Sequence, residues 1–409
     1  MDYDAIVAGA GIWGCTVART LADGGKRVLV LEKRAAVGGN VRCETDPETG
    51  IEVHVYGSHI FHTGIDEVWN FMRRFTEFNG YQHKVLARYG GKTYFLPLGL
   101  ALVNQFYGVD LKPEELPAFI AKEAGGAVGP SNGEDAIATS TRGRSGGSSL
   151  SASARGCSDG VSPSPKNFEE QAISFIGRPL YEAFIREYTR KQWGTDPKNL
   201  SADIIRRLPV RASYDVNYFP DWRQGIPLDG YNAVFDRMLD HPGIEVRCNA
   251  EFKLGDAEFA PSAERPVYYS GPIDALFGYR FGHLPWRSLR FETERAAVKD
   301  FQGTSVVNYT GAEVEFTRIH EFKHYHPENK GAMEAPSTII CREYPKTWEP
   351  GDEPYYPVDT PESRELLAKY RAEAAKVPGL VIGGRLGEYK YYDMDKSVAR
   401  ALETAKAAR

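Results

Sequence analysis

The 409-residue chain has no long hydrophobic run and carries little net charge. No stretch approaches the ~20 apolar residues that cross a bilayer, and no basic, apolar signal opens the sequence. The formal net charge of -5 argues against a general nucleic-acid or membrane-surface binder, although local basic clusters could hold a small anion. The composition, 42% hydrophobic and 26% charged, predicts a soluble protein of two or three packed units.

Cysteine is scarce, and no C-x-x-C pair occurs. The number of cysteines is odd and their positions are widely scattered, so the sequence indicates neither a disulfide framework nor a zinc or dithiol site. A reducing compartment fits this usage best, and we therefore predict a cytoplasmic protein. The five are Cys15, Cys43, Cys157, Cys248 and Cys341.

Aromatic residues are missing between Phe119 and Phe168. The run from about 125 to 165 is rich in Gly, Ser and Ala instead. Such a segment cannot bury enough apolar surface to offset its ordering entropy, so we predict a mobile loop or an insertion there.

The N-terminal segment carries the first chemical signal. Gly9, Gly11 and Gly14 form G-x-G-x-x-G between a predicted strand and a predicted helix, where missing side chains allow a pyrophosphate to approach the helix N-terminus. Glu32 ends the next predicted strand, where an acidic side chain can bond ribose hydroxyls. The pattern predicts a dinucleotide site; the alternative is a tight glycine turn without a ligand.

The residues after Glu32 favour FAD over NAD. Arg34 and the pair Gly38 and Gly39 complete an E-x-R-x-x-x-G-G pattern, and Asn40, a further cofactor candidate, follows it. This extension resembles flavoproteins of the amine oxidase and glutathione reductase type, and the resemblance implies FAD.

Aromatic and basic residues follow the low-complexity run. Tyr181, Phe184, Ile185 and Tyr188 have i, i+3, i+4, i+7 spacing, which predicts one buried face of a helix. Further on, "IIRRLPVR" gathers Arg206, Arg207 and Arg211 around Pro209. Basic residues that follow an aromatic helix suit a diphosphate and a stacked base. From about 244 to 344, short β-rich runs such as "VYYSG", "SLRFETE" and "TIICREY" predict an antiparallel sheet.

Taken in order, these motifs resemble those of prokaryotic UDP-galactopyranose mutases. The resemblance rests on "GAGIWGCTVA", "YGSHIFHT", "YTRKQWG", "RLPVR", "YSGPIDALFGYRFG", "RSLRFETE", "VVNYT", "GDEPYYPV" and "GGRLGEYKYYDM". It spans nearly the whole chain except the Gly/Ser-rich run, where the family has a shorter connection.

The resemblance implies an α/β fold with three domains. A Rossmann-like FAD-binding domain would comprise 1–78, 227–265 and 379–409. A helical substrate and dimer domain would span 79–207 and include the insertion at about 125–165. An antiparallel sheet domain would comprise 208–226 and 266–378.

The resemblance also implies the chemistry. These enzymes interconvert UDP-galactopyranose and UDP-galactofuranose without net redox change, yet need reduced FAD, whose N5 attacks the anomeric carbon as UDP leaves. The detached UDP must stay bound, and two positive side chains meet that need. A flavin reductant such as NAD(P)H and a homodimer are further expectations, with no nucleic-acid or membrane partner.

Motif matches assign the remaining roles. Arg207 and Arg318 would hold the diphosphate, and Arg385 would contact the flavin; a surface position is the alternative for Arg207. Arg287 is a further phosphate candidate, with a structural salt bridge as its alternative. Further substrate contacts would come from the uracil-stacking Tyr188, the sugar-bordering Trp193, and Tyr218, Asn308, Tyr356, Tyr391 and Asp393.

The two histidines of "YGSHIFHT" complete the predicted site. No nearby Cys, Asp or Glu gives a convincing metal spacing, so we predict no metal at His59 or His62. By resemblance His59 would approach the flavin and His62 the substrate, although a structural role is equally open for His62. The chain departs from the family pattern at Ser58, where Ala or Pro is common, and at Glu187, where Gly is usual.

Two alternatives to this function stay open at this point. One is a mutase for another nucleotide sugar, such as a deoxythymidine-linked 6-deoxyhexose. The other is a flavin oxidoreductase or an inactive FAD-binding homologue; Arg207 and Arg318 argue against an amine oxidase, because amine oxidation needs no diphosphate clamp.

Overall fold

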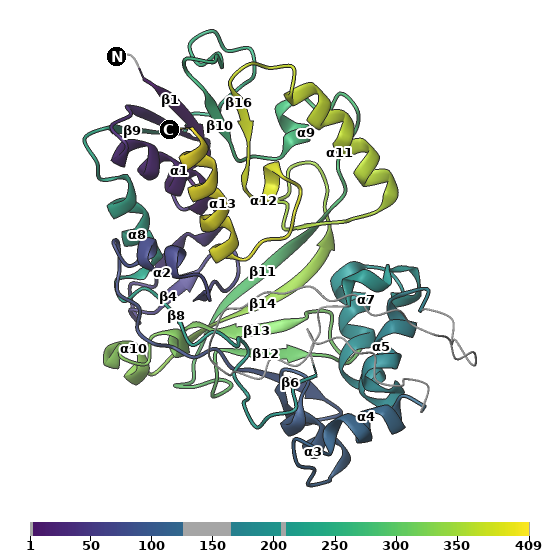
Figure 1. The fold of residues 1–409 in the computed structure, drawn as a ribbon. Coiled ribbons are helices and arrows are strands. Elements are labelled where there is room, and N and C mark those ends of the chain that lie inside the picture. Colours follow the sequence, from purple (N-terminus) through teal and green to yellow (C-terminus); the bar gives the residue numbers. More distant parts are fainter. Residues whose placement is uncertain (1–2, 126–164, 206–209, 409) are drawn as a thin grey trace, which may run out of the picture. The chain divides into compact units, whose positions relative to one another are not determined.

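The computed structural model describes residues 3–125, 165–205 and 210–408 (Figure 1). The chain divides into two compact units, one of Met1–Val85, Asn217–Val307 and Phe316–Arg409, and the other of Leu86–Val216 and Asn308–Glu315. The predicted α/β class is confirmed, since helices accompany both a parallel and an antiparallel sheet. The three-domain boundaries stay a prediction.

The first unit is built on a five-stranded parallel sheet of order β16-β10-β1-β2-β9. Every residue of β1 and β2 is buried, as expected for parallel strands covered on both faces. The strands are β1 (Ala5–Ala8), β2 (Val28–Glu32), β9 (Ile244–Cys248), β10 (Val267–Tyr269) and β16 (Leu380–Ile382).

One sequence expectation for these strands is wrong. The "VYYSG" run contains β10, which pairs in parallel with β1 and β16 and does not belong to the antiparallel sheet. A short apolar run does not by itself distinguish a parallel from an antiparallel partner, because both environments bury such residues.

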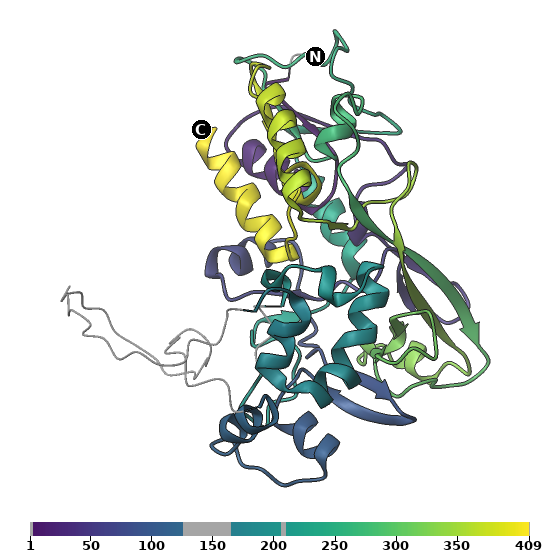
Figure 2. The same cartoon turned by 90° about the vertical axis from the view of Figure 1, so that its right-hand side faces the viewer.

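Helices α1 (Ile12–Asp23) and α13 (Met394–Ala407) run side by side in both views (Figures 1 and 2). The buried positions of α13 include Val398, Ala401, Leu402 and Ala405, which recur with helical spacing and form one apolar face. The other helices of this unit are α2 (Asp66–Met72), α8 (Gly230–Leu239), α9 (Ile273–Leu276), α10 (Lys330–Glu334), α11 (Pro361–Ala374) and α12 (Gly384–Gly387), with 3-10 turns at Gly39–Val41 and Phe322–Tyr325.

The same unit contains an antiparallel sheet of order β15-β11-β14-β13-β12, and the boundary between the units falls inside β12. Figure 2 shows the long β11–β14 pair as a twisted ribbon. The strands are β11 (Trp286–Ala296), β12 (Val306–Tyr309), β13 (Arg318–Glu321), β14 (Thr338–Thr347) and β15 (Tyr356–Pro357), with two small hairpins formed by β3 (Cys43–Thr45) with β4 (Glu52–His54) and β5 (Phe61–His62) with β8 (Gln224–Gly225).

In the second unit, β6 (Val85–Tyr89) pairs with the end of β12, and β7 (Lys92–Leu96) pairs with β6. A π-helical turn, Tyr181–Arg186, interrupts its helices. The predicted core positions Tyr181 and Phe184 are buried, with Ile185 packed against them, which confirms that prediction. The helices are α3 (Leu100–Tyr107), α4 (Leu116–Glu123), α5 (Phe168–Ile176), α6 (Arg178–Leu180) and α7 (Glu187–Trp193), with 3-10 turns at Pro197–Asn199 and Ala202–Ile204.

None of the helices in these described ranges combines the length and hydropathy of a membrane span.

Candidate active site

The glycine turn after β1 has the geometry that its spacing predicts. Gly9 adopts a φ of 106°, a conformation that side chains other than glycine rarely tolerate. A Cβ on Gly14 would lie 1.9 Å from the carbonyl oxygen of Gly9, so α1 can pack this closely only with glycine there. Glu32 closes the turn, because its carboxylate accepts the backbone N–H of Ala10 at 2.7 Å and that of Arg34 at 2.9 Å. Each oxygen keeps a second lone pair for a ribose hydroxyl.

Arg34 occupies a polar cluster beside this turn. Its Nη2 donates to Asn40 Oδ1 at 2.9 Å and pairs with Glu353 Oε2 at 2.8 Å, and its guanidinium lies 4.7 Å from the ring centre of Tyr56. Burial alone would lower the pKa of Arg34, but the charge of Glu353 outweighs it and raises the pKa. Its Nη1 is buried without a hydrogen-bond partner among the described residues. A buried donor of this kind is suited to bind a polar ligand.

His59 is held as a neutral ring. Its Nδ1 lies 2.6 Å from the Gly57 carbonyl oxygen, which can only accept, so Nδ1 carries the proton and Nε2 is free to accept a hydrogen bond. Burial, with help from the charges of His54 and Arg385, lowers the pKa of His59 to about 3. The influence of Arg385 shows that the structure brings these two predicted flavin contacts together. Within the described ranges, no carboxylate pairs with Arg385.

His62 has a different environment. Its Nδ1 lies 2.9 Å from Asp221 Oδ2, and its ring stacks on Phe219 with centroids 3.7 Å apart. These contacts fix the ring firmly, which suits either of the two roles considered for it.

Arg318 begins β13 and faces a buried carboxylate. Its Nε lies 3.2 Å from Glu343 Oε1, and register places the two residues directly opposite each other on β13 and β14. The other carboxylate oxygen of Glu343 lies 3.2 Å from His320 Nε2. Burial would raise the pKa of Glu343, but the charge of Arg318 and the contact with His320 outweigh it, so the net pKa is low and the carboxylate is ionised.

Predicted phosphate-contacting tyrosines lie near this pair. The rings of Tyr356 and Tyr391 are 5.8 Å apart, and Arg318, Arg385 and Tyr218 are close enough to act electrostatically on Tyr356. Desolvation raises the pKa of Tyr356, so its hydroxyl stays protonated and available as a donor. The first unit therefore combines positive charge with neutral hydroxyl donors, which is the chemistry a diphosphate requires.

Arg287 and Asp393 occupy the ends of elements. Arg287 is 6% exposed, donates from Nη1 to Thr347 Oγ1 at 2.8 Å, and lies opposite Tyr356 in the β11–β15 register. Burial lowers its pKa. Asp393 is the residue before α13, without a side-chain capping bond, where its charge favours the positive end of the helix.

In the second unit, Tyr188 and Trp193 lie on α7 directly after the π-helical turn, and both are half-buried. Lys191 on the same helix donates to the carbonyl oxygens of Tyr309 at 2.7 Å and Gly311 at 2.9 Å, and so ties α7 to the segment that contains Asn308. The side-chain oxygen of Asn308 is buried without a hydrogen-bond partner in the part of the chain that the structure describes. Three predicted substrate contacts thus belong to one packed region.

Glu187, one of the two departures, is already paired. Arg190 Nη2 lies 2.7 Å from its Oε2, and Arg186 Nε lies 3.8 Å from its Oε1. The charge that could repel a diphosphate is therefore neutralised locally.

Two predictions fall on residues that the structure does not describe. Arg207 lies outside the described ranges, and so does most of the Gly/Ser-rich run at about 125–165.

Several residues of this region were missed by sequence reasoning. The alternation in "FTRIHEF" puts Arg318 and His320 on one strand face, and that signal could have identified His320. The contributions of Glu343, Asp221 and Glu353 depend on long-range pairing, which local spacing does not contain.

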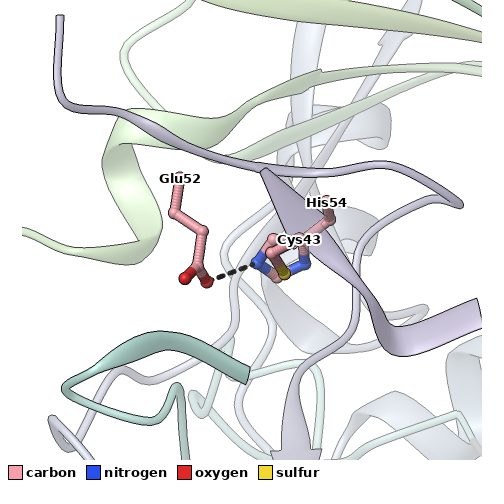
Figure 3. A group of neighbouring side chains, drawn as sticks. All are labelled: Cys43, Glu52 and His54. Carbon is pink, nitrogen blue, oxygen red and sulfur yellow. Dashed lines mark ion pairs between the residues drawn. The ribbon is translucent and has the colours of Figure 1, made fainter. Parts of the chain in front are cut away.

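One described cluster has the residue types of a metal site. Figure 3 shows Cys43, Glu52 and His54, whose ligating atoms lie within 4.8 Å of one another. However, His54 Nδ1 accepts the backbone N–H of His59 at 3.0 Å, so a neutral ring carries its proton on Nε2, the nitrogen that faces Glu52 at 3.5 Å. A protonated nitrogen cannot ligate a metal, so the contact favours a histidine–carboxylate pair.

Comparison with known proteins decides the family. The model of the UDP-galactopyranose mutase family matches residues 183–391, and that of the NAD(P)-binding Rossmann-like domain matches 7–75. A probable UDP-galactopyranose mutase of Klebsiella pneumoniae is 37% identical over 98% of this chain and 93% of its own length. The chain belongs to the UDP-galactopyranose mutase family.

Two further matches concern a second relative and the fold. A dTDP-fucopyranose mutase of Escherichia coli is 35% identical over 98% of this chain and 97% of its own length. A crystal structure of reduced UDP-galactopyranose mutase aligns with a TM-score of 0.69 at 15% identity, covering 99% of this chain and 95% of the other, which shows a shared fold. The protein is therefore an isomerase of this family.

Membership in the UDP-galactopyranose mutase family implies FAD, and the described residues fit it. Gly11 has an ordinary φ of -79°, and the nearest atom to a Cβ there would be 3.9 Å away, so the fold itself leaves room for a side chain. The absence of one keeps the helix N-terminus open to a pyrophosphate. The buried donors Trp13 Nε1 and Arg34 Nη1, both without partners in the described ranges, add sites for a polar ligand.

Proposed function

We propose that this protein interconverts UDP-galactopyranose and UDP-galactofuranose. The observation that supports this most directly is the cationic centre of the first unit, where Arg318 and Arg385 act on Tyr356 while Arg385 also acts on His59. A diphosphate needs such a centre, whereas amine oxidation does not. When bound, reduced FAD supplies the nucleophile, its N5 atom, for the anomeric carbon of the sugar.

The side chains of this protein would hold the pieces in place while they are separate. Arg318 and Arg207 would bind the diphosphate, so that UDP stays beside the sugar after the glycosidic bond breaks. The hydroxyls of Tyr218, Tyr356 and Tyr391 would donate to phosphate oxygens without adding charge. Arg287, Asn308 and Asp393 would complete the substrate contacts, with His62 lining the same pocket.

Base and sugar recognition would rest on aromatic residues. Tyr188 would stack on the uracil ring, and Trp193 would border the sugar. His59 and Arg385 would contact the flavin ring, where the positive charge of Arg385 favours the anionic reduced form.

The test is anaerobic chromatography of UDP-galactofuranose incubated with FAD-loaded protein. We expect conversion to UDP-galactopyranose with dithionite-reduced enzyme and none with oxidised enzyme. No conversion in either sample, with bound and reducible FAD, would contradict the substrate assignment.

A second candidate substrate is a deoxythymidine-linked 6-deoxyhexose. The dTDP-fucopyranose mutase of Escherichia coli favours it, because its identity to this chain, 35%, nearly equals the 37% of the Klebsiella relative. Competition between UDP-galactopyranose and dTDP-fucopyranose in one reaction would give the ratio of the two kcat/KM values and so decide between them.

Electron supply and assembly are further proposals. We expect NAD(P)H to reduce the flavin, which anaerobic stopped-flow absorbance would show, and a homodimer, which sedimentation velocity would show.

A further inference from the structure

A buried chain of hydrogen bonds leads from Tyr325 to Glu343, and the carboxylate of Glu343 forms an ion pair with Arg318. The Tyr325 hydroxyl donates to Ser58 Oγ at 2.5 Å, and Ser58 Oγ lies 2.6 Å from His320 Nδ1. His320 Nε2 faces Glu343 Oε2 at 3.2 Å, and Glu343 Oε1 faces Arg318 Nε at 3.2 Å. Tyr325, His320 and Glu343 are each less than 4% exposed, so no bulk water competes with these contacts.

The direction of the protons follows from the partners. Because Ser58 accepts from Tyr325, its own proton is directed to His320 Nδ1. Burial lowers the pKa of His320, so its ring is neutral and carries one proton, which then lies on Nε2 and points at the carboxylate of Glu343. Each member of the chain donates to the next, and the ionised carboxylate at its end holds the guanidinium.

Strand geometry explains how the chain reaches that guanidinium. Arg318 and His320 are two positions apart on β13 and share a face, and Arg318 lies opposite Glu343 on β14. Glu343 can therefore use one oxygen for each. Ser58 comes from the loop between β4 and β5, so a residue from a distant loop fixes the orientation of the histidine on this sheet.

We propose that Ser58 is a positioning residue for Arg318, acting through His320 and Glu343 to fix the guanidinium that binds the substrate diphosphate. This inference rests on the role proposed above for Arg318. Without the hydroxyl, His320 Nδ1 is a buried acceptor lacking its donor, and the ring, the carboxylate and the guanidinium lose a common orientation.

The first test measures binding of UDP to anaerobically reduced, FAD-loaded protein by calorimetry. We expect Ser58→Ala to weaken UDP binding about tenfold, and Ser58→Thr, which keeps the hydroxyl, to restore most of it. Ser363→Ala is the matched control, because it removes a buried hydroxyl that accepts the Thr360 N–H and donates to the Thr360 carbonyl in the capping box of α11. It should leave the affinity unchanged. Unchanged affinity in Ser58→Ala would overturn the proposal.

A double-mutant cycle shows whether Ser58 acts through Arg318. Arg318→Ala should weaken UDP binding about a hundredfold, and adding Ser58→Ala should then change it less than twofold. If Ser58→Ala weakens UDP binding equally in the presence and absence of Arg318, Ser58 does not act through Arg318 and the proposal is overturned. The diphosphate role of Arg318 would still stand. If Arg318→Ala alone has no effect, the proposed role of Arg318 fails first, and the relay fails with it.

The unaltered protein gives a further test, in which a variant serves only to assign a signal. Two-bond ¹H–¹⁵N spectra of histidine-labelled holoenzyme report which ring nitrogen carries the proton, and His320→Gln identifies the signal. A proton on Nε2 of His320 supports the proposed chain of hydrogen bonds. A proton on Nδ1, directed at Ser58, would reverse its direction and overturn the proposal.

Discussion

The glycine turn after β1 is held by contacts between residues that are close in sequence. The face of the β13–β14 sheet around Arg318 is held by contacts between residues that are far apart in sequence. In the turn, Glu32 accepts from Ala10, 22 positions earlier. Around Arg318, Ser58 reaches His320 across 262 positions, and His62 reaches Asp221 across 159. Short-range contacts leave a spacing pattern in the sequence, whereas long-range contacts depend on register. We therefore expect substitutions in the turn to act through the shape of the backbone, and substitutions on the sheet face to act through the position of charged groups.

The strongest test of this difference is Gly14→Ala. A Cβ at this position would lie 1.9 Å from the carbonyl oxygen of Gly9 and 3.1 Å from a methyl of Val7, and the backbone cannot yield without moving α1. We expect the free energy of unfolding to fall by about 3 kcal/mol or more, with loss of FAD binding. Urea unfolding of the apoprotein measures the first, and flavin absorbance after gel filtration measures the second.

Gly11→Ala is the matched control in the same turn. Its φ of -79° is ordinary and no atom lies closer than 3.9 Å to the added carbon, so apoprotein stability should change little. FAD affinity should nevertheless fall, because the methyl group would occupy the approach of the pyrophosphate. Equal stability losses in both variants would contradict the separation of fold from cofactor binding.

The second prediction concerns Arg385, which we propose to lie near the flavin. Arg385→Met removes a positive charge that, within the described ranges, no carboxylate neutralises, so the anionic reduced flavin should lose stabilisation. We expect the midpoint potential to fall by about 30 mV or more, and the rate of conversion by about tenfold. Anaerobic redox titration and chromatography measure these changes.

Arg280→Met is the control for this prediction. Arg280 is an exposed arginine paired with Glu373, so solvent screens its charge. A similar potential shift in this variant would show that general charge, and not the position of Arg385, sets the flavin potential.

The sequence predicts the turn well and the sheet face incompletely, and the reason is physical. Glycines at fixed spacing specify one backbone path, so Gly9, Gly14 and Glu32 could be placed from the sequence alone. Arg318 was found through its motif, but its partner Glu343 is determined by the β13–β14 register, which a list of residues does not contain. The "VYYSG" run was assigned to the wrong sheet for the same reason.

The third prediction tests whether the sheet face is also the pH-sensitive region. Burial lowers the pKa of His83 to about 3, with a smaller effect from the charge of Arg318. Between pH 5 and 6.5 the unfolded chain binds this proton and the folded one does not, so stability is lost as the pH falls. His83→Gln should reduce the slope of unfolding free energy against pH by about 1 kcal/mol per pH unit, measured by urea unfolding.

His324→Gln is the opposite control. Burial would lower the pKa of His324, but the charges of Glu321 and Asp300 outweigh it and raise the pKa. Its contribution is fully present below the usual pKa of about 6.5 and is lost as the pH rises further, so the slope below 6 should not change. A reduced slope there in His324→Gln, or an unchanged slope in His83→Gln, would contradict the assignment.

The smallest expected effect is that of Glu187→Ala, which tests whether a charge beside Tyr188, the proposed base-stacking residue, affects activity. The carboxylate is bound by Arg190 and lies near Arg186, and exposed pairs of this kind contribute little because solvent screens them. We expect kcat/KM for UDP-galactofuranose to change less than twofold and the free energy of unfolding by about 0.5 kcal/mol or less. A tenfold gain in UDP affinity would show instead that the carboxylate acts on the diphosphate, and charge placement would then matter in the second unit as it does around Arg318.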